Sequence, residues 1–198
     1  MRRASHSQEQ AGLLFAALCA LNGAFVPAFA KLTTNAGSPL FVAATSALFA
    51  GAFAAGVLTV RGELRILATP GVRVRLVAVG ALGTAAAHLM FYAGAHRSTA
   101  IESALCLQIE PLYSLLAAWL ALGHPPTRRR LTAIGILLVG IVCAVGPDGF
   151  TGSSGVWLLL ITPLCWQLSH LVVLRGLPGV APSILTAARY VQIGRAHV

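Results

Sequence analysis

The chain has 198 residues, of which 57% are hydrophobic and only 10% are charged. Soluble domains carry roughly 25% charged residues, so this composition excludes a water-soluble globule. One helical crossing of the hydrocarbon core needs about 20 apolar residues, so a chain of this length has room for several crossings. We therefore expect an all-α, polytopic transmembrane helix bundle.

Long apolar segments follow one another along the chain, separated by short loops rich in Pro, Gly and Asn. The segments are 11–32, 39–60, 74–95, 99–122, 131–146 and 155–174, and a further one begins near residue 182. This pattern predicts six complete spans and a partial seventh. Because the connections are short, consecutive helices are expected to be antiparallel.

Basic residues fall mainly on one side of these segments. With a cytoplasmic N-terminus, the inner side carries Arg2, Arg3, Arg61, Arg65, Arg73, Arg75, Arg128, Arg129, Arg130 and Arg175. Only Lys31 and Arg97 then lie outside, while Arg189 and Arg195 belong to the incomplete segment. This bias predicts a multi-pass protein of the plasma membrane with its N-terminal tail, residues 1–10, in the cytoplasm. The net charge of +9 is thus a topology signal and indicates no nucleic-acid partner.

The first span follows a polar tail, and it is too long and too interrupted for a cleaved signal peptide. It contains one polar side chain, Asn22, and one proline, Pro27, that would kink the helix. Asn22 is therefore a candidate for contact with a substrate.

In the third span, Gly80, Thr84, His88 and Tyr92 recur every four residues, which places them on one helix face. Such a face combines a close-packing groove with one titratable imidazole. His88 is thus a candidate coupling residue, and a hydrogen-bonded packing role is its alternative.

The fourth span contains two acidic residues, Glu102 and Glu110. An ionised side chain at membrane depth costs about 2.5–3.5 kcal/mol, so each should face protein or water. At 100° per residue, one side of this helix carries Ser103, Cys106, Glu110, Tyr113 and Ser114. Pro111 cannot donate to the carbonyl of Leu107, which predicts a kink beside the carboxylate. Glu110 is either a coupling centre or a protonated structural group, and Glu102 could simply be solvated.

The sixth span contains Pro163, Trp166, Gln167 and His170. Trp166 and Gln167 could line a substrate pocket or serve as hydrogen-bonding contacts between helices.

Enzymatic function finds little support in the motifs. Residues 152–155 match the Gly-x-Ser-Gly of rhomboid-type proteases, but His170 lies 16 residues beyond Ser154. That separation is roughly 24 Å along a helix, too far for a nucleophile and its base. The chain has no HExxH, Walker or GxGxxG motif, and its four cysteines lie in apolar runs without metal-ligand spacing. We expect no enzymatic activity, cofactor or metal.

The start of the chain and its last part show weak internal similarity. The aligned pairs are Asn22 with Trp166, Lys31 with Arg175 and, after one deletion, Ser46 with Arg189. The repeat unit then has five spans, so the second copy would enter the membrane from the opposite side, as in inverted-repeat transporters. This division predicts a first repeat at 11–146, a linker at 147–154 and the start of a second repeat at 155–192. Chance alignment of Ala- and Leu-rich helices is the alternative.

The most specific motifs are IEPLYSLLA at 109–117, LALG at 120–123 and GILLVG at 135–140. With them the chain resembles the EamA domain of the drug/metabolite transporter superfamily over residues 12–192, and the Glu-Pro pair is the best marker. The resemblance implies five spans per copy and ten in a complete protein. It also implies secondary-active, proton-coupled transport of small metabolites, amino-acid-like compounds or drugs by alternating access.

Two positions depart from the family pattern. Members often have Glu where this chain has His124, and Arg where it has Ser46, which leaves Arg189 in the second copy. Residues 193–198 are similar to a translated sequencing adapter, so we expect 1–192 to be an authentic, C-terminally truncated fragment. Such a fragment is expected not to transport by itself and could dimerise.

The candidate residues for substrate binding or coupling are Glu110, Pro111, Glu102, Asn22, His88, Trp166, Gln167 and Arg189. The expected partners are a small-molecule substrate and the lipid bilayer. The alternative function is a non-transporting scaffold, or half of a hetero-oligomeric membrane assembly, in which the two glutamates only hold helices together.

Overall fold

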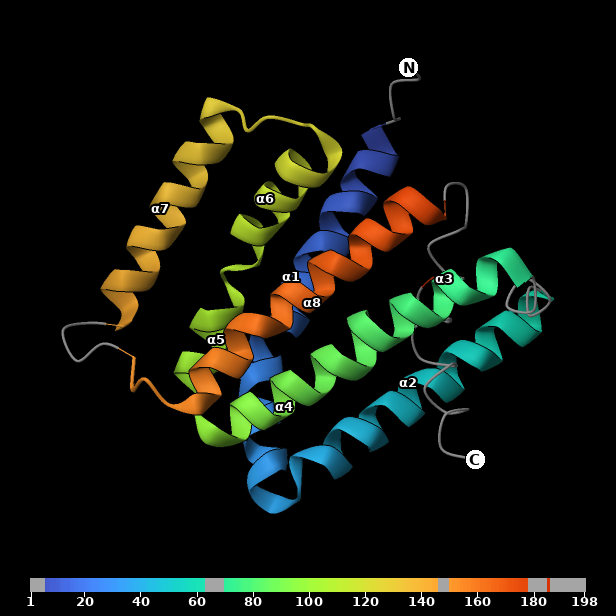
Figure 1. The fold of residues 1–198 in the computed structure, drawn as a ribbon, viewed down its shortest axis with the longest axis horizontal. Coiled ribbons are helices and arrows are strands. Elements are labelled where there is room, and N and C mark those ends of the chain that lie inside the picture. The colour runs from blue at the N-terminus through green and yellow to red at the C-terminus, as the bar shows by residue number, and fades with distance from the viewer. Residues whose placement is uncertain (1–5, 63–69, 146–149, 178–184, 186–198) are drawn as a thin grey trace.

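The computed structural model describes residues 6–62, 70–145, 150–177 and 185. Within these residues the secondary structure is entirely helical and forms six rods (Figure 1). Four rods are single helices: α1 (His6–Ala36), α2 (Pro39–Arg61), α7 (Arg128–Val145) and α8 (Ser154–Gly176). One rod joins α3 (Pro70–Gly80), the π-helix η2 (Ala81–Ala86) and α4 (Ala87–Arg97). The last joins α5 (Ala100–Leu107) and α6 (Glu110–Leu122).

Local sequence sets where these helices begin and end. The Ser38 side chain accepts a hydrogen bond from the amide of Phe41 and caps α2, whose first residue is Pro39. Gly62 ends the same helix with a left-handed φ of 68°, and Gly123 ends α6 with a φ of 70°. A side chain is disfavoured in this backbone region, so glycine allows both helices to end abruptly.

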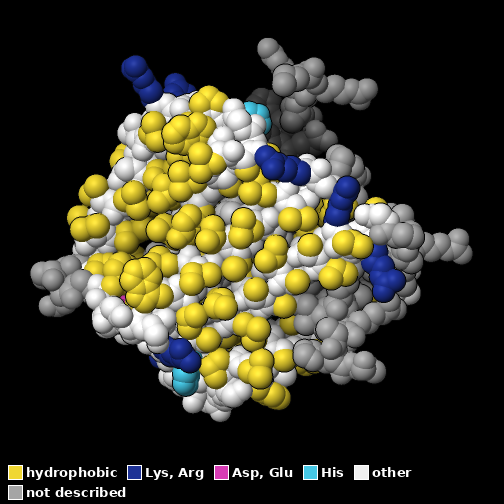
Figure 2. Space-filling view, in the orientation of Figure 1, with side chains coloured by type: hydrophobic (Ala, Val, Ile, Leu, Met, Phe, Trp, Pro, Cys, Tyr) yellow, Lys and Arg dark blue, Asp and Glu magenta, His cyan; other side chains and the backbone are white. Residues whose placement is uncertain are grey.

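The surface of the molecule is apolar along the helices. Phe49 and Phe53 on α2 are 79% and 78% exposed, whereas polar Thr84, Thr162 and Ser169 are buried. Figure 2 shows hydrophobic side chains covering the visible face, with basic side chains mainly towards its margins. This arrangement suits a hydrocarbon solvent, in which apolar side chains face outwards and polar ones face protein.

Within the described part of the chain, five helices are long and apolar enough to cross a membrane, and they fall on five of the six predicted segments. They are Gly12–Ala36, Pro39–Arg61, Gly71–Arg97, Ala100–Leu122 and Ser154–Gly176.

The expectation of six complete spans is supported for these five segments, whereas α7, on the remaining segment, is a described helix that is not among them. Three arginines occupy its first turn, so its apolar part is only residues 131–145. At 1.5 Å per residue this part rises about 22 Å, against a hydrocarbon core of about 30 Å. The partial seventh span lies outside the described residues, except for Leu185.

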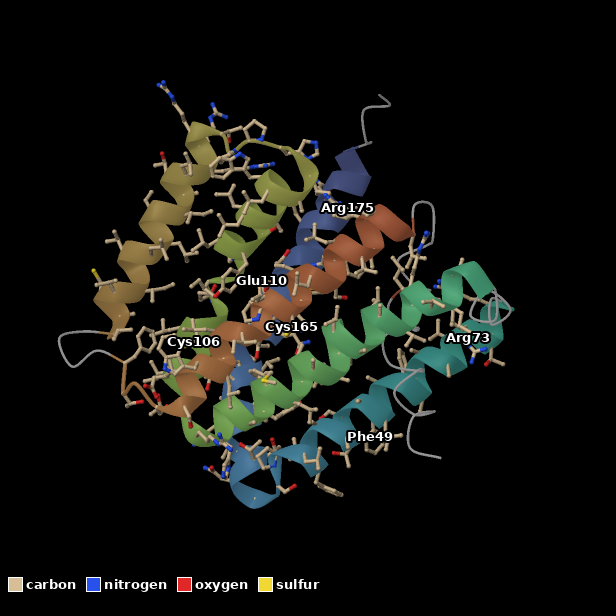
Figure 3. The ribbon with its side chains drawn as sticks, viewed as in Figure 1. Phe49, Arg73, Cys106, Glu110, Cys165 and Arg175 are labelled. Carbon is tan, nitrogen blue, oxygen red and sulfur yellow. The ribbon has the colours of Figure 1, made fainter. Side chains whose placement is uncertain are left out.

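Contacts between helix ends show how the rods alternate in direction. Lys31 near the end of α1 donates to the carbonyl of His96 at the end of α4, with an N···O distance of 2.8 Å. At the opposite end of the bundle, Arg75 on α3 donates to the carbonyl of Gly176, and Arg175 on α8 donates to that of Ala121 on α6. Figure 3 labels Arg175 and also Arg73, another arginine of this end.

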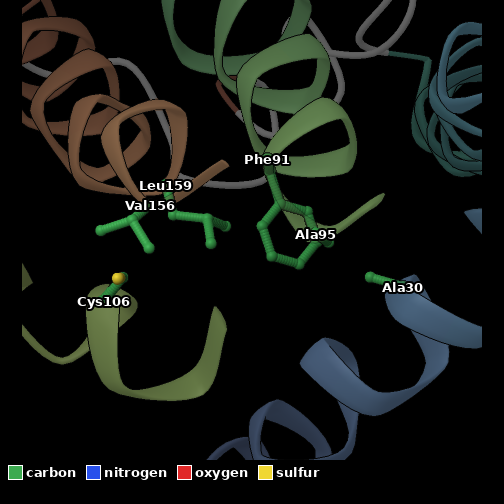
Figure 4. Packing of buried hydrophobic residues seen from close by; sticks show 6 residues of the cluster. All are labelled: Ala30, Phe91, Ala95, Cys106, Val156 and Leu159. Atoms are coloured by element: carbon green, nitrogen blue, oxygen red, sulfur yellow. The ribbon is translucent and has the colours of Figure 1, made fainter. Parts of the chain in front are cut away.

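Helix α8 lies at the centre of the bundle and packs against α3, η2, α4, α5 and α6. The main apolar core joins four helices and comprises Ala30, Phe91, Ala95, Cys106, Val156 and Leu159 (Figure 4). Beside it α4 and α8 approach at Gly94 and Gly155, where an added Cβ on Gly94 would lie 2.9 Å from the Gly155 carbonyl oxygen. Small residues thus bring the two backbones together.

Candidate functional site

The fourth span is interrupted near its middle, where Pro111 predicts a kink. Helix α5 ends at Leu107 and α6 begins at Glu110. In the turn between them, the amide of Gln108 bonds to the carbonyl of Leu105 at 3.1 Å, a tighter i−3 pattern. Pro111 has no amide hydrogen to offer the carbonyl of Leu107. The break therefore places polar backbone next to the Glu110 carboxylate (Figure 3).

Glu110 faces α8 across this break. The Nε2 atom of Gln167, a side chain only 7% exposed, lies 3.3 Å from Oε1 of Glu110 and donates to it. Both side chains line a pocket of about 460 Å³. Its lining residues are Leu107, Gln108, Glu110, Pro111, Ser114, Gln167 and His170. The fold thus brings together three of the sequence candidates, Glu110, Pro111 and Gln167.

This arrangement can bind a cation or exchange a proton. A carboxylate has about four acceptor positions, and the Gln167 amide occupies one while fixing the orientation of the group. The low dielectric constant inside a protein strengthens the attraction between the carboxylate and a bound positive charge. The pocket therefore suits a small molecule with an ammonium group, or a proton in its place.

Glu102 has a different environment from Glu110, although both lie in the same span. It is 7% exposed, and its Oε2 accepts from the amide and hydroxyl of Thr99 at 2.8 and 3.0 Å. Its Oε1 accepts from the amide and hydroxyl of Thr151 at 2.9 and 2.7 Å. Glu102 therefore completes a capping box at the start of α5 and ties that start to the segment before α8. It is buried rather than facing solvent.

Asn22 lies in a second, smaller pocket of about 270 Å³ between α1, α2 and α4. Ser46 and Tyr92 also line this pocket, and the Tyr92 hydroxyl donates to Ser46 Oγ at 3.2 Å. Ser46, one of the two departures from the family pattern, is thus a hydrogen-bond partner of the third span.

The other candidates lie apart from the Glu110 pocket or outside the described residues. His88 is half-buried, with its ring centroid 6.1 Å from that of Tyr92. Trp166 is half-buried beside Gln167 in sequence but is not among the residues that line the Glu110 pocket. Arg189 lies outside the described residues. The fold therefore does not gather all the candidates in one place.

The π-helix η2 was not anticipated from the sequence. The amide of Ala87 bonds to the carbonyl of Leu82, five residues back, and η2 packs against α8. The Ser169 hydroxyl donates to the carbonyl of Val79 at 3.3 Å, one turn from this wider segment. Single π-turns often occur at functional sites. The face that carries Gly80 and Thr84 predicted close packing here, but no local signal indicated a π-turn.

The role of Thr151 was also not predicted, because a threonine in a Gly- and Ser-rich loop has no distinguishing sequence signal.

Among the described residues, no group of three or more His, Cys, Asp or Glu side chains could hold a metal ion.

Comparison with known proteins identifies one family. Residues 10–146 match the EamA-like transporter family. No curated protein and no solved structure matches the chain. The matched segment includes α2 to α7, and therefore Glu110 and Pro111, whereas Gln167 and His170 lie beyond it in α8.

Proposed function

The chain belongs to the EamA-like transporter family, and from that premise we propose that it is a secondary-active, proton-coupled permease whose substrate pocket contains Glu110 and Gln167. As a member of this family it is a multi-pass membrane transporter and not an enzyme. Its proposed substrates are small metabolites, amino-acid-like compounds or drugs that carry a positive charge.

One observation carries this proposal: a carboxylate and an amide from two helices meet in a pocket at a helix break. Glu110 and Gln167 are separated by 57 positions in sequence, yet their side chains are 3.3 Å apart. A carboxylate that binds either an ammonium group or a proton provides exchange, because the two ligands compete for the same oxygens. Such competition couples the movement of the substrate to that of the proton.

The direction of α8 supports a further part of the proposal, an inverted repeat. The end of α1 lies beside the end of α4, as the contact from Lys31 to His96 shows. The start of α8 lies at this same end, since Thr151 just before it binds Glu102 at the start of α5. Helix α8 therefore runs opposite to α1, as the first helix of an inverted second copy would.

In this reading the pocket lies between the first repeat, which contributes Glu110, and the second, which contributes Gln167. Alternating access would rock one copy against the other, so the hydrogen bond between these side chains would break and re-form during transport. We place the protein in the plasma membrane with its N-terminus in the cytoplasm, because the basic residues concentrate at one end of the bundle.

Ligand binding to the purified chain tests the pocket directly. A panel of amino acids, amines and cationic drugs is screened by thermal unfolding in detergent, and hits are titrated calorimetrically in buffers of different ionisation enthalpy. We expect at least one cationic compound to bind and to release a proton. Glu110→Gln should weaken its binding at least tenfold and abolish the proton release, because the amide can neither hold a proton nor attract the cation.

Glu102→Gln is the matched control, since it neutralises the other carboxylate of the same span. It should lower the unfolding temperature but leave the affinity unchanged, because Glu102 does not line the pocket. Unaltered binding in Glu110→Gln would restrict Glu110 to holding α6 against α8, as expected of a scaffold.

A further inference from the structure

A third and larger pocket lies between α6 and α7. Its volume is about 850 Å³. Its lining residues are Pro111, Ser114, Leu115, Ala118, His124, Pro125, Arg130, Ala133 and Ile134. Helix α7 packs against α5, and Figure 1 shows it as an outer helix beside α6. We call this space the α6–α7 groove.

One end of the α6–α7 groove is basic and lacks a matching acid. Arg130 and His124 line it there, and both side chains are exposed. The first turn of α7 holds three arginines and no acidic residue. Cations at a helix N-terminus are unfavourable, because that end of the helix is itself partially positive. An external anion at this end would offset both charges.

The chain offers few carboxylates for this purpose. It has 5 acidic residues against 14 Lys and Arg. Of these, Glu102 is bonded to two threonines and Glu110 lies against Gln167. These two are the carboxylates among the described side chains, and neither lines the groove, so an anion from outside the protein can serve as the counter-charge of Arg130.

The rest of the α6–α7 groove is mainly apolar and extends deep into the span. From Gly123 to Pro111, α6 rises about 18 Å, more than half of the hydrocarbon thickness of about 30 Å. Ile136, Val139 and Val142 on α7 are highly exposed, as suits a helix that contacts lipid chains. A ligand of this groove needs a negative head at the membrane surface and a long apolar tail.

We propose that the α6–α7 groove binds one anionic phospholipid. Its phosphate lies at Arg130 and His124, and one acyl chain runs along Ala118 and Leu115 towards Pro111. A second copy of this chain is a poor occupant, because a symmetric contact here would bring two arginine clusters together. Pro111 and Ser114 line both this groove and the Glu110 pocket, so the bound chain would lie against the turn that carries Glu110.

Tryptophan quenching by brominated lipids tests the proposal. Trp119 follows Ala118 on α6 and is about half exposed, so a Trp157→Phe, Trp166→Phe double variant leaves it as the single reporter. The full chain is reconstituted in vesicles that contain brominated phosphatidylglycerol or brominated phosphatidylcholine. We expect stronger quenching by the anionic lipid at equal mole fraction. Arg130→Gln should reduce that preference about fivefold, the effect of one arginine near an anionic lipid surface.

Arg73→Gln is the matched control, because it removes the same charge from the same end of the bundle, away from the α6–α7 groove. It should leave the preference unchanged, Arg130→Lys should largely preserve it, and circular dichroism should show equal helicity in all variants. Equal quenching by both lipids would overturn the proposal, as would an unaltered preference in Arg130→Gln. Relief of quenching by inorganic phosphate would indicate a free-anion site, and absence of quenching would indicate a groove covered by protein. Either result would also overturn it.

Discussion

Two glutamates eight positions apart in one span have opposite environments. Glu102 accepts four hydrogen bonds from two threonines, which fully engage both of its oxygens. Glu110 is engaged by one amide and otherwise faces a pocket. A saturated carboxylate stabilises the fold but has little capacity left for a ligand, whereas Glu110 retains that capacity. Burial alone would not distinguish the structural role of Glu102 from the binding role of Glu110. The two roles differ because the two carboxylates accept different numbers of hydrogen bonds.

Loss of the Glu102 contacts should destabilise the protein. We expect Glu102→Ala to lower the free energy of unfolding by about 2–4 kcal/mol, because it removes the side-chain half of the capping box and leaves donors of Thr99 and Thr151 unpaired. Thr151→Val keeps the cap and removes one side-chain bond, so it should cost about 1 kcal/mol. Chemical unfolding in mixed micelles measures both. Equal effects of the two variants would contradict the capping role.

At the scale of the element, the packing of α8 depends on glycines rather than on large side chains. An added Cβ on Gly155 would lie 2.7 Å from the Gly94 carbonyl oxygen and 2.8 Å from the backbone carbon of Arg97. Backbone atoms cannot rotate away as a side chain can. The close approach of α4 and α8 therefore requires glycine, and this approach also fixes how α8 presents Gln167 to Glu110.

Adding a single methyl group at Gly155 should push α4 and α8 apart. Gly155→Ala is expected to lower stability by about 1–3 kcal/mol, the usual cost of overpacking. Gly56→Ala on α2 is the control, because nothing lies within 4 Å of its added Cβ. That variant should be neutral or slightly stabilising, since alanine favours a helix more than glycine does. If thermal unfolding shows the same change for both variants, the close contact between α4 and α8 is not what requires Gly155.

Over the whole molecule, charge divides the bundle into two ends. Arg75 and Arg175 bond to helix-terminal carbonyls at one end, whereas Lys31 does so at the other. Basic side chains at helix C-termini offset the partial negative charge there. Between these ends, the exposed side chains along the helices are mostly apolar. Charged ends and an apolar middle are what a membrane-embedded bundle requires.

The same charge division predicts orientation. In a background without the native cysteines, Asn35→Cys should react with an impermeant maleimide added to intact cells, and Arg129→Cys should react only after lysis. Both positions are exposed and lie at opposite ends, so accessibility on the protein itself does not bias the result. The opposite labelling pattern would show that the N-terminus lies outside.

Features that depend on near neighbours in the chain could be predicted from the order of residues alone. Apolar length indicated the spans, loops rich in Pro, Gly and Asn indicated where they end, and Pro111 indicated the break beside Glu110. The family followed from motifs within one helix or two. Each of these features arises from backbone chemistry or local patterning, which the order of residues specifies directly.

Which polar groups lie in contact depends on how the helices pack, and it could not be predicted from the sequence. Periodicity placed Glu110 on a polar face, but it could not show that Gln167 lies opposite that face, or that Thr151 closes around Glu102. It also gave no sign of η2, whose wider turn lies where the third span packs against α8. These features depend on how distant helices cross, and the crossing is set by close packing at sites such as Gly94 and Gly155. The pattern of one helix does not contain that information, because it says which face is polar but not what the face touches.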